Sequence, residues 1–190
     1  YILYRDIFGA NTKFSENEVY VYIPTDATYD EVKNIVAPYI KDMSRFEMVA
    51  TKKSYPERSD KSGRFLLKKG MNSNEIVNSL RLNVPVNLAF NNQERLENFA
   101  GRIGSQIEAD SLSLLDAFRD KKFLEENGFT EENVLSMFVP NSYEFFWNTS
   151  AVKFRDRMAK EYRKFWTNDR LEKAKQLNLT PIQVSILASI

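Results

Sequence analysis

The sequence predicts an α+β fold, and two observations indicate it. Between Val19 and Lys68, two strand-like runs enclose two helical patterns, in the order strand, helix, helix, strand. From Leu96 onward, apolar residues recur mostly at helical spacing. The chain has 190 residues, 43% of them hydrophobic and 28% charged, which suits one large or two small domains with a buried core.

The first segments of the chain predict a peripheral piece and then a strand. Residues 1–17 mix aromatic and polar side chains without a clear period, and we expect a tether or a peripheral strand there. Residues 19–23 are β-branched and aromatic, and Pro24 closes the run. This pattern is typical of a strand.

Capping boxes predict three helices in the first half. In each box a Thr, Ser or Asn is followed three residues later by Glu, so that the side chain and the backbone cap one another. The first of these helices should end or kink at Pro38. The three boxes are Thr28 with Glu31, Ser44 with Glu47, and Asn72 with Glu75.

Two further strands are expected in the first half. The polar residues 51–62 predict a loop, and residues 64–68 predict a strand after it. Residues 84–90 predict a third strand, which Pro85 places near a sheet edge because proline lacks the amide that a central strand needs.

The second half is predicted to be mainly helical. An aromatic segment, residues 138–147, interrupts the helices. Gly128 should stop one helix, and Thr180 should cap the last one, with proline following it and Gln183 closing the box. The helical patterns cover about residues 96–107, 112–118, 123–127 and 151–166, and a last pattern follows Thr180.

Composition excludes several classes of function. The chain contains no Cys and no His, so disulfides, thiolate nucleophiles, Ser-His-Asp hydrolysis and His-ligated metals are all excluded. A net charge of +1 does not favour a general nucleic-acid binder. The glycines form no dinucleotide or phosphate loop, and no acidic cluster has calcium-loop spacing. We therefore predict no cofactor, no metal and no nucleic-acid partner.

Three features could carry chemistry, and each has a plainer alternative. The aromatic segment could form a groove wall that stacks on sugar rings, although a buried aromatic corner is the commoner arrangement. Desolvation could raise the pKa of Glu144 toward that of a general acid, although such a residue more often faces solvent. The basic run from Lys52 to Lys69 could bind an anionic polymer or lipid headgroups, but it fits a solvated face better.

The aromatic segment and the last helix resemble the YceG-like endolytic murein transglycosylases. That family carries an aromatic residue, a variable residue and then Pro-Asp-Thr-Tyr, which residues 138–143 match except for Asn141 in place of Asp and Ser142 in place of Thr. The family's Leu-Ala-Ser-Ile is matched by residues 187–190. The strand-helix-helix-strand unit is similar to the family's LysM-like subdomain.

The resemblance implies a domain plan and a location. Residues 1–17 would be a tether after a removed N-terminal membrane helix, and residues 18–70 the LysM-like β-α-α-β subdomain. Residues 71–190 would be the first part of a mainly helical α+β catalytic domain, incomplete at its C-terminus. The whole protein would be anchored in the inner membrane and face the periplasm.

The resemblance also implies an activity. The family members are lytic transglycosylases, that is, lyases of cell wall biogenesis, and they cleave the MurNAc-GlcNAc bond of peptidoglycan to leave a 1,6-anhydromuramyl end. The family's catalytic Glu would lie just after Ile190, so the chain as given contains no catalytic residue and should be inactive. Asn141, Tyr143, Glu144 and Ser189 would bind substrate. Implied partners are glycan strands and cell-wall synthases.

Two other functions remain open from the sequence. The chain could be a non-catalytic glycan-binding or scaffold module of the cell envelope. It could also be a lyase that uses pyridoxal phosphate, because the family has carried an aminodeoxychorismate lyase label. The latter ranks last, since no Lys suited to a Schiff base accompanies a glycine-rich phosphate turn.

Overall fold

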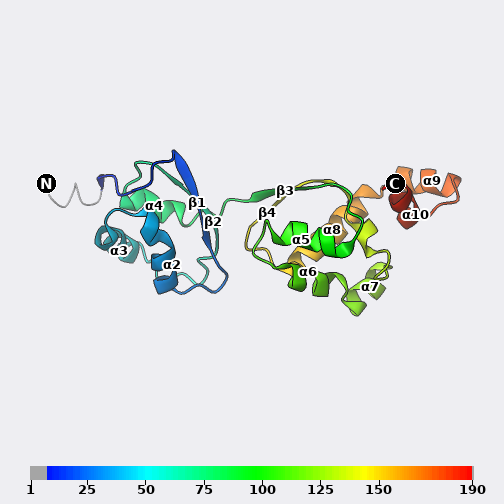
Figure 1. The fold of residues 1–190 in the computed structure, drawn as a ribbon, viewed down its shortest axis with the longest axis horizontal. Coiled ribbons are helices and arrows are strands. Elements are labelled where there is room, and N and C mark those ends of the chain that lie inside the picture. The colour runs from blue at the N-terminus through cyan, green and yellow to red at the C-terminus, as the bar shows by residue number, and fades with distance from the viewer. Residues whose placement is uncertain (1–7, 190) are drawn as a thin grey trace. The chain divides into compact units, whose positions relative to one another are not determined.

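The computed structural model describes residues 8–189, which form two compact units (Figure 1). Unit 1 contains the described residues up to Pro85 together with Phe146–Asn148, which we call the return segment. Unit 2 contains Val86–Phe145 and the described residues from Thr149 onward. Helices combine with two small antiparallel sheets, which confirms the α+β class. Within residues 8–189, no helix is long and apolar enough to cross a membrane.

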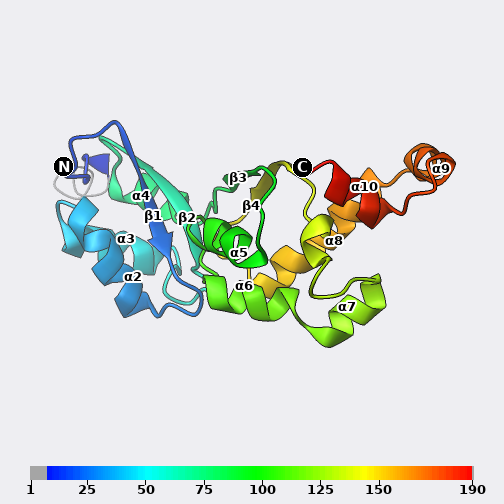
Figure 2. The same ribbon diagram turned by 45° about the vertical axis from the view of Figure 1, so that its right-hand side comes forward.

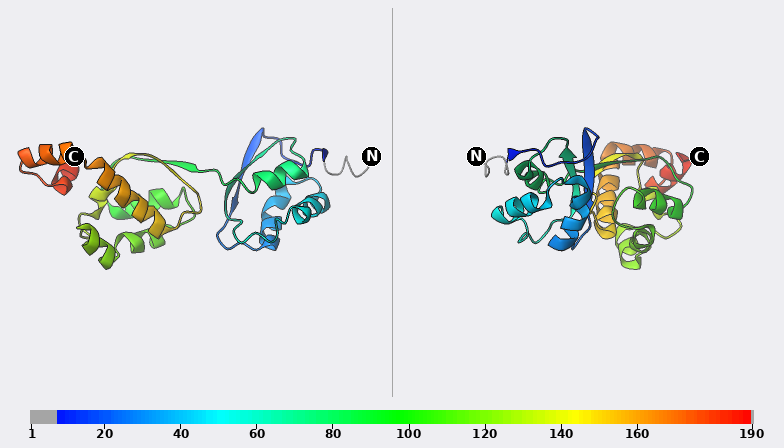
Figure 3. Two further views of the ribbon diagram at one scale, coloured as in Figure 1. Left: turned by 180° about the vertical axis from the view of Figure 1, so that it is seen from behind. Right: turned by 60° about the vertical axis from the view of Figure 1, so that its left-hand side comes forward.

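Unit 1 is built on the strand pair that the sequence predicts. Strands β1 and β2 pair antiparallel, with Glu18 opposite Lys68 and Ile23 opposite Gly63. In the views of Figure 1 and Figure 3, the helices of unit 1 gather on one side of this pair. The elements are β1 (Glu18–Ile23), α2 (Tyr29–Val36), η1 (Ala37–Tyr39), α3 (Met43–Lys52), β2 (Gly63–Lys68) and α4 (Ser73–Ser79).

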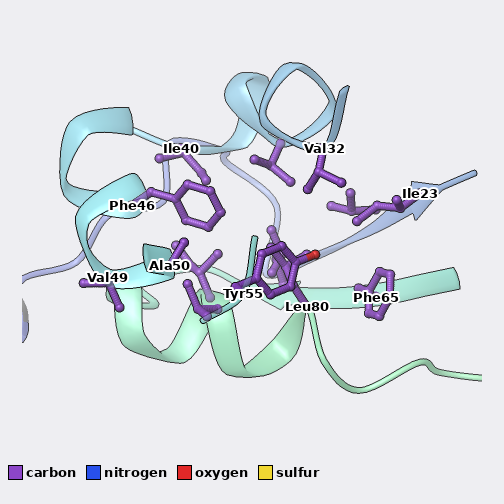
Figure 4. Close-up of a cluster of buried hydrophobic side chains, with 14 residues drawn as sticks. Ile23, Val32, Ile40, Phe46, Val49, Ala50, Tyr55, Phe65 and Leu80 are labelled. Carbon is purple, nitrogen blue, oxygen red and sulfur yellow. The ribbon is translucent and has the colours of Figure 1, made fainter. Parts of the chain in front are cut away.

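The core of unit 1 lies between the strand pair and the helices. Alternate residues of the two strands point inward, including Ile23 and Phe65, and they are buried. Figure 4 shows Val32 of α2, Phe46 of α3 and Tyr55 in the same cluster as Ile23 and Phe65 of the strands. A lone strand pair would be marginal in water, so this helical cover is what stabilises it.

Two of the three predicted capping boxes are confirmed, and one is wrong. Both Thr28 and Asn72 cap their helices reciprocally with the Glu three residues later. Ser44, by contrast, lies inside α3, because Asp42 is the N-cap and its carboxylate accepts from the Arg45 amide at 3.1 Å. The Asp42 carboxylate therefore accepts from a backbone amide of the first helical turn, and the helix begins two residues earlier than the sequence pattern predicted.

The N-terminal piece is part of unit 1 from the point where the structure describes it. Of the predicted tether, residues 1–7 lie outside the described residues. Asn11 is fully buried, and its amide donates to the Asp42 carbonyl and the Ser73 hydroxyl, each at 2.9 Å. Residues 8–17 are therefore docked on the unit. At its other end the unit continues past the expected boundary at Gly70 and includes α4.

Unit 2 holds the second strand pair and most of the helices. Strands β3 and β4 pair antiparallel, with Val86 opposite Phe145 and Phe90 opposite Asn141. In Figure 2 the long helix α8 runs beside α6 and ends near α10. The elements are β3 (Val86–Phe90), α5 (Leu96–Gly104), α6 (Ser111–Phe118), α7 (Lys121–Asn127), η2 (Val134–Met137), β4 (Asn141–Phe145), α8 (Ala151–Phe165), α9 (Asn168–Gln176) and α10 (Pro181–Leu187).

An aromatic cluster forms the core of unit 2. The Phe99 and Phe138 ring centroids are 4.3 Å apart, and those of Phe145 and Phe154 are 4.9 Å apart. Phe118 packs between α5 and α8, with its centroid 4.7 Å from that of Phe138. Part of the aromatic segment is thus a buried corner, the plainer of the two alternatives.

A chain of hydrogen bonds holds the return segment on unit 1. The Asn148 amide donates to the Ser62 hydroxyl at 2.7 Å, and its carbonyl accepts from the Asn83 amide at 3.0 Å. Asn83 in turn accepts from the backbone amide of Arg64 at 3.1 Å. The start of β2, the segment before β3 and the return segment are therefore tied together.

Candidate functional site

A groove within unit 2 is the strongest candidate for a functional site. Its volume is about 570 Å³, and six parts of the unit contribute to it. They are the end of β3 with the loop that follows it, helix α5, residues 132–136 around the start of η2, residues 138–140, the end of α8, and α10.

The floor of the groove is aromatic. Phe90, Phe99 and Phe138 all line it. The Phe90 ring meets Phe99 edge to face at 4.8 Å between centroids, and Phe99 contacts Phe138. Because these rings belong to the buried core, their positions are fixed before any ligand arrives.

The rim of the groove carries amide and hydroxyl groups. Asn133 accepts from the Thr130 amide at 2.8 Å, and the Ser136 hydroxyl donates to the Asn133 carbonyl at 2.6 Å. On the other side, the Asn92 amide donates to the Ala188 carbonyl at 3.4 Å, which joins the loop after β3 to α10. The amide and hydroxyl side chains of the rim are Asn91, Asn92, Gln93, Asn133, Ser136, Ser185 and Ser189.

The charged groups of the groove are carboxylates. Glu94 and Glu132 line it, and among the described lining residues there is no Lys or Arg. A hydrogen bond from the Thr130 side chain holds the pKa of Glu132 below its usual value. Glu132 therefore stays ionised at neutral pH and is unsuited to donate a proton. The groove suits an uncharged, hydroxyl-rich ring with apolar faces, and it does not favour a phosphate group.

Tyr143 supports the groove from behind instead of lining it. The sequence placed it on the groove as a stacking face or a phenol donor. In the structure it is only 8% exposed, its ring stacks on Phe90 at 5.6 Å, and its hydroxyl donates to the Val139 carbonyl at 2.7 Å. Side chains along β4 alternate between its two faces, and Tyr143 lies on the face toward the core. The role of Tyr143 is therefore to position Phe90 and Val139.

Asn141 and Glu144 are both exposed on β4, outside the lining of the groove. Asn141 directly follows the lining residue Pro140 and pairs with Phe90, so its side chain starts at the groove edge. Its carbonyl oxygen accepts from the Ser142 amide at 2.8 Å. Glu144 lies farther along the strand and is exposed to solvent.

The last helix contributes one wall, and Ser189 lies just after the end of this helix. The Ser189 hydroxyl donates to the Ile186 carbonyl at 2.6 Å, and both residues line the groove. Thr180 caps α10 with the reciprocal box that the sequence predicts. Ile190, the last residue of the quoted motif, lies outside the described residues. The structure thus brings Ser189 into the groove with the residues just before Asn141.

Several lining residues were missed from the sequence. The run Asn91-Asn92-Gln93 comes directly after β3, and three amides at a strand end are a recognisable signal for hydroxyl binding. Trp166 ends the long helix, and its role in the lining depends on how α8 crosses the unit, which no local pattern indicates.

Comparison with models of protein families identifies one family. The sequence profile of the YceG-like family matches residues 21–190. Among solved structures, a protein from Listeria monocytogenes described as YceG-like matches at 18% identity with a TM-score of 0.48, covering 88% of this chain and 61% of that chain. The chain thus spans less than two thirds of that protein's length. No protein of curated function matches the sequence.

Proposed function

Since the chain belongs to the YceG-like family, we propose that it is part of a peptidoglycan transglycosylase and that its unit 2 groove holds a glycan strand. The reaction would cleave the MurNAc-GlcNAc bond and leave a 1,6-anhydromuramyl end. One observation carries the proposal. An aromatic floor lies beneath a rim of amides and hydroxyls, which is the combination that a sugar with apolar faces and polar edges requires.

The proposed chemistry needs a single carboxyl group. One Glu protonates the glycosidic oxygen and then takes the proton from the muramyl 6-hydroxyl, whose oxygen attacks the anomeric carbon and closes the anhydro ring. The attacking group belongs to the substrate, so a second carboxylate of the kind used in glycoside hydrolysis is not required. By the resemblance, that Glu follows the Leu-Ala-Ser-Ile match. The residues described here would bind and orient the strand.

The roles of individual residues follow from their positions. The half-buried rings of Phe165 and Trp166 would contact the apolar face of a sugar above the buried floor, while the rim amides would accept and donate hydrogen bonds to hydroxyl and acetamido groups. Asn141 would reach the glycan strand from the groove edge, and Ser189 would contact it from the turn that follows α10. Tyr143 would act by holding Phe90 and Val139 in place.

The cellular setting is also a proposal. In the family's arrangement, an N-terminal helix anchors the protein in the inner membrane, and the enzyme faces the periplasm, where peptidoglycan lies. Cell-wall synthases would be its protein partners, because strand cleavage must be matched to strand synthesis.

A non-catalytic glycan-binding module is the second candidate, and Glu132 favours it. This groove carboxylate has a lowered pKa and so does not fit the role of acid. If neither Glu94, the other carboxylate of the groove, nor a carboxyl group outside the described residues acts as the acid, binding alone would remain.

Product analysis separates the two candidates. The protein as its gene encodes it, and the 190-residue chain by itself, are each incubated with purified peptidoglycan, and the products are identified by mass spectrometry. We expect 1,6-anhydromuramyl ends from the former and none above a blank from the latter. No anhydro ends from either would leave the binding module as the function. Anhydro ends from the 190 residues alone would show that the acid lies within them.

Binding to the groove has its own test. Asn141→Ala should weaken the binding of soluble glycan strands by about tenfold, the scale of losing well-placed hydrogen bonds. The matched control is Asn87→Ala, which removes another exposed amide, from β3. Equal binding by both variants would remove Asn141 from the site.

A further inference from the structure

The charge on the unit 2 groove has one sign. Among the described residues that line the groove, the charged ones are Glu94 and Glu132, and both are exposed. Neither carboxylate forms an ion pair with a cation of the described chain. Glu132 is ionised at neutral pH because the Thr130 side chain stabilises its charged form through a hydrogen bond. A neutral glycan strand in the groove would leave both negative charges without a partner.

The pocket next to the groove does not supply the missing positive charge. Glu132 also lines this second pocket, which lies beside the start of α5 and the end of α6 and contains Arg95 and Arg119. Arg119 forms ion pairs with Glu97 and with Glu131, the latter at 3.8 Å from Nε. Arg95 also interacts electrostatically with Glu97. Four carboxylates thus face two guanidinium groups across the groove and this pocket, and the region keeps a negative charge.

The aromatic wall of the groove is compatible with a bound cation. The half-buried rings of Phe165 and Trp166 line the groove, and the negative face of an aromatic ring attracts positive groups. Arg170, which is not among the lining residues, already stacks over the Phe165 ring at 4.1 Å from its centroid. Rings and carboxylates together therefore favour an ammonium group over a carboxylate as the charge that a ligand brings.

One kind of sugar combines an apolar ring face with an ammonium group. An amino sugar whose acetyl group has been removed keeps the ring that packs on aromatic side chains and gains a positive charge at its second carbon. That charge would pair with a rim carboxylate while the ring contacts the wall. Because Glu94 and Glu132 are exposed, each pair would change the affinity a few-fold and not by orders of magnitude.

We propose that Glu94 and Glu132 make the unit 2 groove selective for glycan strands whose amino sugars are N-deacetylated. The inference rests on the proposed function, since it takes the groove to be a glycan site, and it adds the class of strand that the groove prefers. Strands with acetylated sugars still bind through the wall and the rim amides. Strands that bring carboxylates into the groove bind least well.

The test uses two short sugar chains of equal length and different charge. They are the hexamer of N-acetylglucosamine and the fully deacetylated hexamer of glucosamine. At about pH 6 the carboxylates are ionised and the amino groups of the sugar are protonated. Trp166 lines the groove and Trp147 belongs to the return segment of unit 1, so the indole N–H signal of Trp166 in a proton–nitrogen NMR titration of the full chain gives the affinity of the groove alone. Trp147→Phe assigns the two signals.

We expect the deacetylated hexamer to bind the groove about fivefold more tightly than the acetylated hexamer at low ionic strength, the scale of two exposed ion pairs. In Glu94→Gln combined with Glu132→Gln, the two hexamers should bind within about twofold of each other. Salt at about 1 M should remove the preference of the wild-type chain, because it screens charges beyond about 3 Å. The control, Glu125→Gln combined with Glu144→Gln, removes two exposed carboxylates outside the groove lining and should keep the preference.

The outcomes that overturn the selectivity differ from those that overturn the glycan site. Equal binding of the hexamers by the wild-type chain, or tighter binding of the acetylated one, would refute the selectivity and leave the groove as a glycan site. A preference that persists in the groove variant, or that the control loses equally, would refute the role of these two carboxylates. Hexalysine brings a similar charge without sugar rings, and an equal shift of the Trp166 signal by hexalysine would show that the groove recognises charge alone. If neither hexamer moves this signal, the glycan site and its selectivity fail together.

Discussion

The hydroxyl of Tyr143 donates a hydrogen bond to the carbonyl of Val139 at 2.7 Å, and this contact closes the chain around Pro140. Val139 and Pro140 both line the groove, whereas Tyr143 does not. Its ring also stacks on Phe90, which lies on the groove floor. A residue behind the groove therefore fixes the shape of three positions inside it.

Tyr143→Phe should cost about 1 kcal/mol in the free energy of unfolding, because one nearly buried hydrogen bond is lost while the ring packing stays. Glycan binding should weaken with it, since Val139 loses its restraint. Urea unfolding followed by circular dichroism measures the first effect, and calorimetry the second. Tyr22→Phe, at an exposed position, is the control and should change the unfolding free energy by less than about 0.5 kcal/mol. A Tyr143→Phe protein as stable as wild type would show that the hydroxyl bonds equally well to water.

Thr180→Ala should loosen the groove wall that α10 provides. This helix has seven residues and none of its side chains is buried, so its capping box supplies much of its stability. Losing the cap costs about 1 kcal/mol, and we expect faster amide hydrogen exchange in α10 together with weaker strand binding. Thr28→Ala breaks the equivalent box of α2 in unit 1 and should leave strand binding by the groove unchanged. Unaltered exchange in Thr180→Ala would contradict the prediction.

The elements that could be predicted from the sequence are those with a local cause. Thr28 and Thr180 identify their helices because an N-cap acts within one turn, and the strand at residues 19–23 follows from its β-branched and aromatic composition. Strand β4 was missed because Asn141–Phe145 becomes a strand only by pairing with β3, far away in the sequence. The direction of the Tyr143 side chain toward the core also depends on this pairing of β4 with β3.

Gly63 and Gly101 should respond to alanine in opposite directions. Gly63 has φ +138°, and a Cβ there would lie 2.5 Å from the Asn83 side chain that anchors the return segment. Gly63→Ala should destabilise unit 1 by about 2 kcal/mol or more. A Cβ on Gly101, inside α5, meets nothing within 4 Å, and Gly101→Ala should stabilise unit 2 by about 0.5–1 kcal/mol. Thermal unfolding of the two variants checks the signs, and the same sign for both would refute this account.

Burial of Tyr55 makes the stability of unit 1 depend on alkaline pH. Burial raises the pKa of Tyr55 from its ordinary value of 10.0 to about 12. Below pH 10 the phenol is protonated in both states, so its contribution is complete. As the pH rises from about 10 to about 12, only the unfolded chain ionises, and stability falls by up to about 1.4 kcal/mol per pH unit.

Urea unfolding at about pH 9 and about pH 11.5 should reveal this loss, which spans the interval where only the unfolded phenol is charged. Tyr55→Phe removes the titrating group but keeps the buried ring, so it should show a smaller fall over the same interval. Equal alkaline losses in the two proteins would mean that the Tyr55 phenol ionises as readily when folded as when unfolded.

The membership of the return segment in unit 1 sets an order of events on the ribosome. The core of unit 1 is complete once residue 85 has emerged, but Asn148, which bonds to Ser62 and Asn83, is made only after both strands of unit 2. During synthesis from the N-terminus, Ser62 and Asn83 therefore lack their hydrogen bonds to Asn148 until the intervening residues have been added. In a nascent chain halted before Asn148, unit 1 would have its core but would lack the hydrogen bonds that the return segment makes to it.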